Sequence, residues 1–286
     1  MLTAGCYISE PFLSVLLVEV RVVLLLSKIL VTFLTVAMLA IVARRYGPAW
    51  AGVLAGFPLG SAITLYFIGY EQSAEFAADG ARHALIGLAG SLMLAITYLY
   101  VSRRWHQPKA ILMPVLLAPL AFLVTVAPLQ YWQGEWWLNT VLILGFIWLA
   151  RQRLRRVEDV NVVINRDNIW QRPVPAIFFR AGMATLSVVG ITALAHWLSP
   201  SQAGLLAAFP VSFFPVLIIL QLSYGAPVVA ATVKQYPGGL VAMVIYIVLV
   251  GLTYPIAGLH WGTALSLAGA TVYLLAYAIT TRKLRA

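Results

Sequence analysis

The chain has 286 residues, of which 62% are hydrophobic and only 10% are charged, and its formal net charge is +10. Soluble domains are about half apolar and about a quarter charged, so this composition excludes a soluble globular enzyme as well as a disordered chain. It is typical of a helical membrane protein that crosses the bilayer several times. The single cysteine, Cys6, excludes a disulfide framework.

The first 21 residues contain Glu10, Glu19 and Arg21 around a short apolar run. No small-residue cleavage site follows this run, so we do not interpret the segment as a signal peptide. It is either an N-terminal extension of the first span or the result of an upstream start.

Charged residues divide the rest of the chain into apolar runs that are long enough to cross a bilayer about 30 Å thick as helices. Two runs, 181–233 and 235–281, contain no Asp, Glu, Lys or Arg. Each is too long for one span, so each must hold two, with breaks near Ser199-Pro200 and within 255–261, where turn residues gather. The sequence therefore predicts an all-α protein with nine transmembrane helices, at roughly 22–43, 49–69, 84–102, 110–129, 136–150, 175–197, 203–223, 237–254 and 262–280.

Lysine and arginine are concentrated in the loops that follow the first, third, fifth, seventh and ninth of these spans. Examples are Arg44-Arg45, Arg103-Arg104, Arg151–Arg156, Lys234 and Arg282-Lys283. Such loops lie in the cytoplasm, which places the N-terminus outside and the C-terminus inside. We interpret Glu71, Glu75 and Asp79 as a solvated acidic loop on the outer side. The bilayer is the expected partner, and the net charge requires no nucleic acid to explain it.

The sequence repeats itself at an offset of 152 residues. Residues 51–58 read AGVLAGFP and residues 203–210 read AGLLAAFP, so six of the eight positions are identical. The same offset, without a gap, relates Pro48 to Pro200, Lys28 to Arg180, Arg82 to Lys234 and Gly87 to Gly239. The sequence therefore predicts an internal duplication of a four-helix unit.

The two copies are expected to have opposite orientations, because a fifth span separates them. Their loops agree: Arg44-Arg45 follow the first helix of the first copy, whereas the corresponding His196-Trp197 carry no Lys or Arg. We therefore predict two inverted repeats. The expected segments are 1–21 as an extension, 22–134 as repeat 1, 135–173 as a linker helix with a basic loop, and 174–286 as repeat 2.

Repeat 1 resembles the GlpM family of small four-helix proteins of the bacterial inner membrane. The resemblance rests on a basic residue opening the first helix (Lys28), the AGxxxxFP motif, the acids Glu71 and Glu75, and Arg82. Repeat 2 keeps the basic residues and the motif but has Ser223 and Pro227 in place of the acids. The resemblance implies a bacterial inner membrane, four-helix units and a link to exopolysaccharide production, but no particular reaction.

The fused architecture is also similar to the antiparallel pairs formed by small multidrug transporters. Those proteins bind cations at a glutamate in their first helix. Here Lys28 and Arg180 open the corresponding helices, so we do not expect a cationic substrate.

Ionisable residues within spans are expensive and are therefore functional candidates. Lys28 and Arg82 are expected toward the outer face, and their counterparts Arg180 and Lys234 toward the cytoplasm. As a function, each pair would attract a carboxylate or phosphate at one face of an alternating pathway. The alternative is that these long side chains snorkel to the headgroups, or that Arg82 pairs with Glu75 or Asp79.

The Phe-Pro motifs fall inside the second and seventh predicted spans. Proline removes a backbone hydrogen bond and kinks a helix, and matching breaks in two repeats indicate the binding site of a transporter. The alternative is a packing kink. The candidate site residues here are Phe57, Pro58, Ser61, Phe209, Pro210 and Ser212.

Sequence motifs for hydrolysis, nucleotide binding and metal binding are absent, so we expect no enzyme, no cofactor and no metal site. The leading hypothesis is a transporter or flippase-like protein for a small anionic or phosphate-bearing substrate, with anionic lipid as a possible partner. The alternative is a non-catalytic scaffold in envelope polysaccharide or lipid metabolism. An intramembrane lipid enzyme ranks last, because no nucleophile or carboxylate pair lies at membrane depth.

Overall fold

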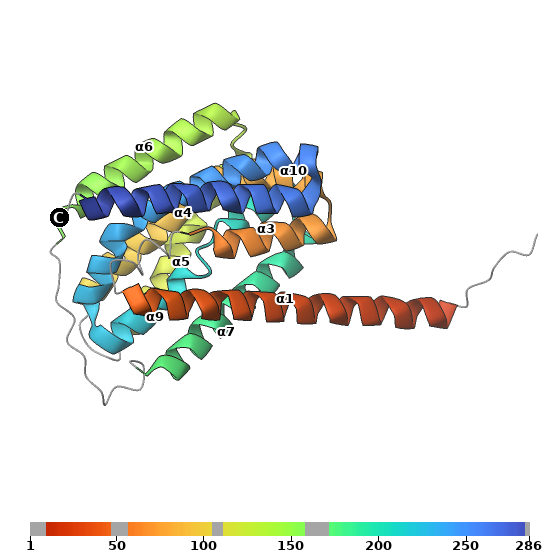
Figure 1. Cartoon of the computed structure of the whole chain (residues 1–286), viewed down its shortest axis with the longest axis horizontal. Coiled ribbons are helices and arrows are strands. Elements are labelled where there is room, and N and C mark those ends of the chain that lie inside the picture. The colour runs from red at the N-terminus through yellow and green to blue at the C-terminus, as the bar shows by residue number, and fades with distance from the viewer. Residues whose placement is uncertain (1–9, 47–56, 105–110, 158–171, 284–286) are drawn as a thin grey trace, which may run out of the picture.

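The computed structural model describes residues 10–46, 57–104, 111–157 and 172–283 (Figure 1). Every regular element in these ranges is a helix and none is a strand, as the composition predicts. The elements are α1 (Glu10–Tyr46), α3 (Leu59–Glu71), α4 (Ala74–Arg104), α5 (Leu112–Val126), the short 3₁₀ helix η2 (Pro128–Tyr131), α6 (Trp136–Leu154), α7 (Pro173–Ala195), α8 (Pro200–Ala207), α9 (Phe213–Tyr224) and α10 (Ala226–Lys283).

Four of the described helical segments are long and apolar enough to cross a membrane. They are Ala74–Arg104, Leu112–Tyr131, Pro173–Ala195 and Ala226–Tyr277. Two shorter apolar stretches, Val22–Met38 and Phe213–Tyr224, accompany them. Large apolar side chains are exposed on the outer faces of α1, α5 and α6. A bilayer would cover such surfaces, so the fold is compatible with a membrane-embedded protein.

Helix α10 is a hairpin of two helical halves that turn at Gly258. This residue has φ 72° and ψ 178°, a conformation that glycine adopts without steric penalty. The halves are joined by hydrogen bonds between Tyr254 Oη and Thr263 Oγ1 (2.8 Å) and from Tyr273 Oη to the carbonyl of Gly238 (3.3 Å). The turn lies within the predicted break at 255–261.

Two predicted helix starts are wrong. The helix predicted to begin at 84 begins at Ala74, because Ser73 Oγ accepts a hydrogen bond from the Phe76 N–H (3.0 Å) and Glu75 lies in the first turn. Glu75 and Asp79 are therefore helical. The helix predicted to begin at 237 begins at Ala226, and Pro237 lies inside it, as proline can within a membrane helix.

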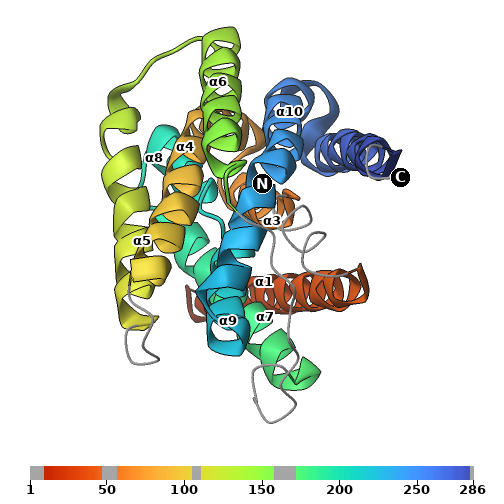
Figure 2. The same cartoon turned by 90° about the vertical axis from the view of Figure 1, so that its left-hand side faces the viewer.

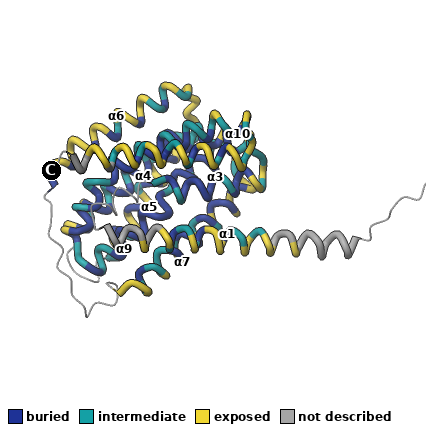
Figure 3. The backbone as a smooth tube through the Cα atoms, viewed as in Figure 1, coloured by how far each residue is buried: buried dark blue, intermediate teal, exposed yellow. Residues whose placement is uncertain are grey.

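The core is built around α4, which packs against α5, α8 and α10. Helix α6 contacts α4 on one side and α10 on the other (Figure 2). The tube in Figure 3 is buried along α4, α9 and the first half of α10, and exposed along α6. Helix α1 packs along α7 through Val36, Ala181 and Ala184. Its N-terminal part projects beyond the bundle (Figure 1).

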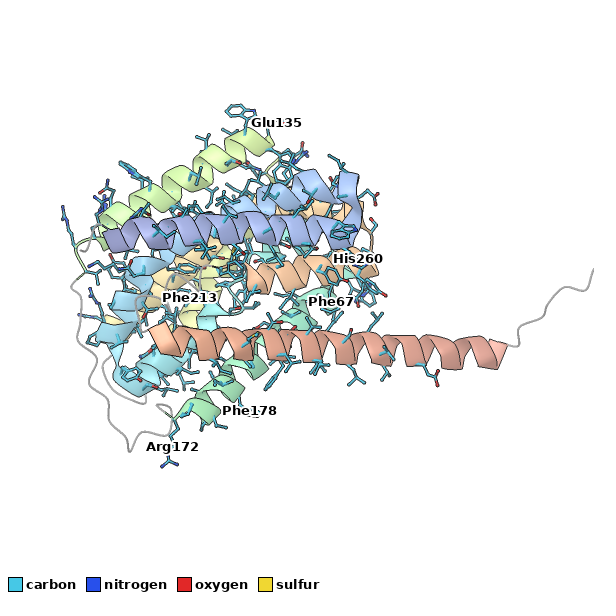
Figure 4. All side chains as sticks on the ribbon, viewed as in Figure 1. Phe67, Glu135, Arg172, Phe178, Phe213 and His260 are labelled. Atoms are coloured by element: carbon cyan, nitrogen blue, oxygen red, sulfur yellow. The ribbon has the colours of Figure 1, made fainter. Side chains whose placement is uncertain are left out.

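The described loops that the sequence assigns to the outer side lie at one end of the molecule. Glu135 and His260 lie toward one end and Arg172 toward the other (Figure 4). We name these the His260 end and the Arg172 end. Three hydrogen bonds join loops or helix ends at the His260 end: Gln72 to His196 (3.0 Å), Tyr66 to His260 (3.1 Å) and Gln202 to Gln130 (2.8 Å).

Candidate functional site

The two Phe-Pro motifs adopt the same backbone turn, and each is followed by a helix. The residues before Phe57 lie outside the described part of the chain, whereas the second motif separates two helices instead of kinking a continuous one. Pro58 is the N-cap of α3, and residues 208–212 separate α8 from α9. Two hydrogen bonds recur at the 152-residue offset. The bond from Leu59 N to Phe57 O (2.8 Å) corresponds to the bond from Val211 N to Phe209 O (2.8 Å). The bond from Ala62 N to Pro58 O (2.6 Å) corresponds to the bond from Phe214 N to Pro210 O (2.9 Å).

The two turns meet in the core. A methyl group built on Gly60 would lie 2.2 Å from Val211 Cγ2 and 3.3 Å from Ser212 Oγ. Gly60 and Ser212 are related by the 152-residue offset of the sequence, so the chain segments that follow the two turns pack directly on one another. Pro58, Ser61, Pro210 and Ser212 are buried, whereas Phe57 and Phe209 are half-buried. The structure thus brings together the six motif residues that the sequence selected.

Side chains of α3 and α4 donate hydrogen bonds to carbonyls that the break between α8 and α9 leaves open. Ser61 Oγ of α3 donates to the carbonyl of Ala207 (2.7 Å), and Ser91 Oγ of α4 donates to that of Ala208. A broken helix leaves such carbonyls without their usual partners, and in an apolar interior each must find another donor. Ser212 Oγ is buried with no hydrogen-bond partner among the described residues. The break is therefore supported mainly by α3 and α4.

Replacing Ser61 or Ser91 with alanine is expected to lower the free energy of unfolding by about 1–3 kcal/mol each, because a buried carbonyl loses its donor. Thermal unfolding of the purified protein in detergent measures the change. Ser187→Ala is the matched control, since this hydroxyl donates only to Met183 O within α7. Equal effects of all three substitutions would contradict the role of Ser61 and Ser91 at the break.

A second polar cluster joins α1, α3 and α7. Lys28 Nζ lies 2.6 Å from Glu71 Oε1 and donates to Thr192 Oγ1 at 2.9 Å. The side chains of Lys28 and Glu71 are only 7% and 11% exposed. The interpretation of Glu71 as part of a solvated loop is therefore wrong: it ends α3, and its carboxylate balances an ammonium group that could not be buried alone.

His196 connects this ion pair to the surface. Its Nε2 lies 3.5 Å from Glu71 Oε2, and its Nδ1 accepts from Gln72 Nε2 at 3.0 Å. The side chain of His196 is 48% exposed. On the inner side, Lys28 Nζ lies 5.9 Å from the centroid of the Phe67 ring. Phe67 packs with Ile63, Val188, Ile191 and Val211, so an apolar cluster joins the ion pair to the helix breaks.

The four predicted basic residues do not converge on one cluster. The Arg82 guanidinium lies over the Trp136 ring at 5.7 Å, and the described salt bridges do not join it to Glu75 or Asp79. Lys234 Nζ donates to the carbonyl of Val157 at 2.7 Å. Arg180 is half-buried in α7. Lys28 alone of the four is more than nine-tenths buried.

Sequence reasoning missed Thr192, His196, Ser91 and the burial of Glu71. One weak signal exists: Thr192 and His196 are four residues apart and therefore lie on the same face of α7. No local pattern indicates that this face meets Lys28, because the contact spans 164 residues of chain.

Comparison with known proteins finds no matching protein family, no matching curated protein and no matching solved structure. Within the described ranges, no group of three or more His, Cys, Asp or Glu side chains could hold a metal ion. A hollow of about 570 Å³ at the Arg172 end is lined by Gln152, Arg153, Arg155 and Arg156.

Proposed function

We propose that the protein is a secondary transporter or flippase-like protein for a small anionic or phosphate-bearing substrate, with alternating access between two inverted repeats. One observation carries the proposal. The two Phe-Pro turns have backbone hydrogen bonds at the same two corresponding positions, and the turns pack against each other in the core. Paired helix breaks at the interface of two repeats are the usual site of substrate binding in secondary transporters.

The packing of equivalent helices supports the inverted arrangement. Helix α1 packs on its counterpart α7, and α4 packs on α10, whose first half is the counterpart of α4. The linker α6 touches both α4 and α10. In the proposed architecture the nine spans are α1, α3 with the residues before it, α4, α5, α6, α7, α8 with α9, and the two halves of α10. The His260 end faces outside and the Arg172 end faces the cytoplasm of a bacterial inner membrane.

The basic residues supply the proposed preference for anions. Lys28 belongs to the His260 end and Lys234 to the Arg172 end, so one basic residue lies on each side of the Phe-Pro turns. The arginines around the hollow at the Arg172 end also suit anionic lipid headgroups. The resemblance of the motif residues to the GlpM family fits this membrane setting.

The proposed orientation predicts a labelling pattern. Trp197, which is 88% exposed, belongs to the outer face, and the exposed Arg153 belongs to the cytoplasmic face. With Cys6 replaced by serine, Trp197→Cys should react with a membrane-impermeant maleimide in intact cells. Arg153→Cys should react only after permeabilisation. The reverse pattern would overturn the orientation, and labelling of both variants in intact cells would overturn the span count.

A thermal-stability screen of the purified protein tests the function. The probes are inorganic phosphate, glycerol 3-phosphate, succinate and phosphatidic acid, with a cationic dye as control. Binding to the folded state alone at 100 times Kd stabilises by about 2.7 kcal/mol. A shift that only anions produce, and that Lys28→Ala abolishes, supports the proposal. No shift with any probe would favour the scaffold alternative.

A further inference from the structure

We propose that Glu71 is the proton-coupling carboxylate of this transporter, so that each negative charge bound by Lys28 is accompanied by one proton on Glu71. This inference rests on the proposed function and specifies its coupling ion. It starts from the position of the only carboxylate that contacts a buried cation among the described residues.

The ion pair leaves no cation available to an incoming anion. Lys28 Nζ lies against Glu71 Oε1 and Thr192 Oγ1, and the Phe67 ring covers it from the apolar side. An anion can therefore bind Lys28 only by displacing the carboxylate. The displaced carboxylate would be buried without its partner, which costs several kcal/mol.

Proton uptake removes that penalty and keeps the cluster neutral. Before binding, the ammonium and the carboxylate sum to zero charge. After binding, the ammonium pairs with one negative charge of the substrate, and a proton from water converts Glu71 to a carboxylic acid. The sum is again zero, so the loaded cluster is no more costly to bury than the empty one.

His196 offers the proton a route from water. Because Gln72 donates to Nδ1, the neutral imidazole carries its hydrogen on Nε2, which faces Glu71 Oε2 at 3.5 Å. The ring is 48% exposed, so water can reach it. When Nδ1 takes a proton from water in place of the hydrogen bond from Gln72, the imidazolium can pass its Nε2 proton to Glu71 Oε2 and is left as the neutral tautomer with its hydrogen on Nδ1.

Few other ionisable groups face Glu71. Lys28 approaches from α1 and His196 from the end of α7. Within α3, Tyr66 is bonded to His260 of α10 (3.1 Å). Glu75 and Asp79 of α4 are exposed. The equivalent of Glu71 in repeat 2 is Ser223, so the coupling carboxylate belongs to one repeat only.

Infrared spectroscopy of the purified protein tests the proton uptake without any substrate. Lys28→Met leaves Glu71 without its ammonium partner, as binding of an anion to Lys28 would. Lys28→Gln serves if the first variant fails to fold. At neutral pH we expect a carboxylic-acid C=O band that the wild-type protein lacks and that disappears on adding Glu71→Gln. If Glu71 stays ionised in the Lys28 variants, the inference is overturned.

A flux measurement tests the coupling. Proteoliposomes that contain a pH-sensitive dye are given inorganic phosphate, glycerol 3-phosphate or succinate, and the flux of anion is compared with the movement of protons. We expect one proton per negative charge bound by Lys28, with Glu75→Gln behaving as wild type. In Glu71→Gln, any remaining anion flux should carry no protons.

The outcomes separate the two proposals. If none of the three anions moves, the transporter function fails as stated, while the infrared result still decides whether Glu71 takes up the proton. Anion flux without protons in the wild type, or unchanged proton movement in Glu71→Gln, overturns the coupling role and leaves transport standing. If Glu71→Gln moves no anion, the ratio of protons to anions in the wild type and the infrared band decide whether Glu71 couples the proton.

Discussion

Replacing Glu71 with alanine is expected to lower the free energy of unfolding by about 3–5 kcal/mol, because Lys28 is then buried without a carboxylate. The two side chains are at most 11% exposed, so water screens the pair only weakly. Thr192 remains as a hydrogen-bond acceptor for Lys28 Nζ, but a hydroxyl does not balance an ammonium charge. Equilibrium unfolding in mixed micelles, followed by tryptophan fluorescence, measures the loss.

The double variant Lys28→Met with Glu71→Ala should recover most of that loss, because no uncompensated charge is left in the interior. Glu75→Ala is the matched control: it removes the same charge from an exposed position and should change stability by no more than about 0.5 kcal/mol. If Glu71→Ala is no worse than this control, the ion pair contributes nothing to stability.

Much of the fold follows from burial and charge, which are visible in the sequence. Apolar runs located the segments that became α4, α5, α6 and α7, and turn residues located the break at Gly258. The orientation that the alternation of loop charges indicates stays a prediction. The sequence does not predict the helix starts at Ala74 and Ala226, because acidic and proline-containing segments are typical of loops. Both residue types also suit the first turn of a helix.

Of the candidate site, only the part formed by the repeated Phe-Pro motif is predicted by the sequence. The Phe-Pro motifs stand out because they occur twice, and the structure brings both to one place. The ion pair occurs once and joins α1 to the end of α3, while Thr192 lies in α7 and His196 at the C-terminal end of α7. In the sequence Glu71 is followed by Gln72 and lies near Glu75, a polar pattern that is typical of a solvated loop. Only the tertiary packing of α1, α3 and α7 shows that Glu71 is buried.

Gly204→Ala is expected to be among the most destabilising single-methyl additions in the chain, lowering the free energy of unfolding by about 3 kcal/mol or more. A methyl group on Gly204 would lie 1.9 Å from the carbonyl oxygen of Gly80 and 2.8 Å from its Cα. These are backbone atoms of α4, so no side chain can rotate away. Helix α8 would have to separate from α4, and the caps that Ser61 and Ser91 provide at its C-terminal end would be lost with it.

Gly182 and Gly190 of α7 provide the matched controls, because a methyl group there would meet no atom within 4 Å. Gly→Ala at an open helical position favours the helix by about 1 kcal/mol, so both controls should leave the protein as stable as the wild type or slightly more stable. The same unfolding experiment compares the three variants. A Gly204→Ala protein as stable as the controls would show that α4 and α8 do not cross this closely, and would remove the support that α8 gives to the second Phe-Pro turn.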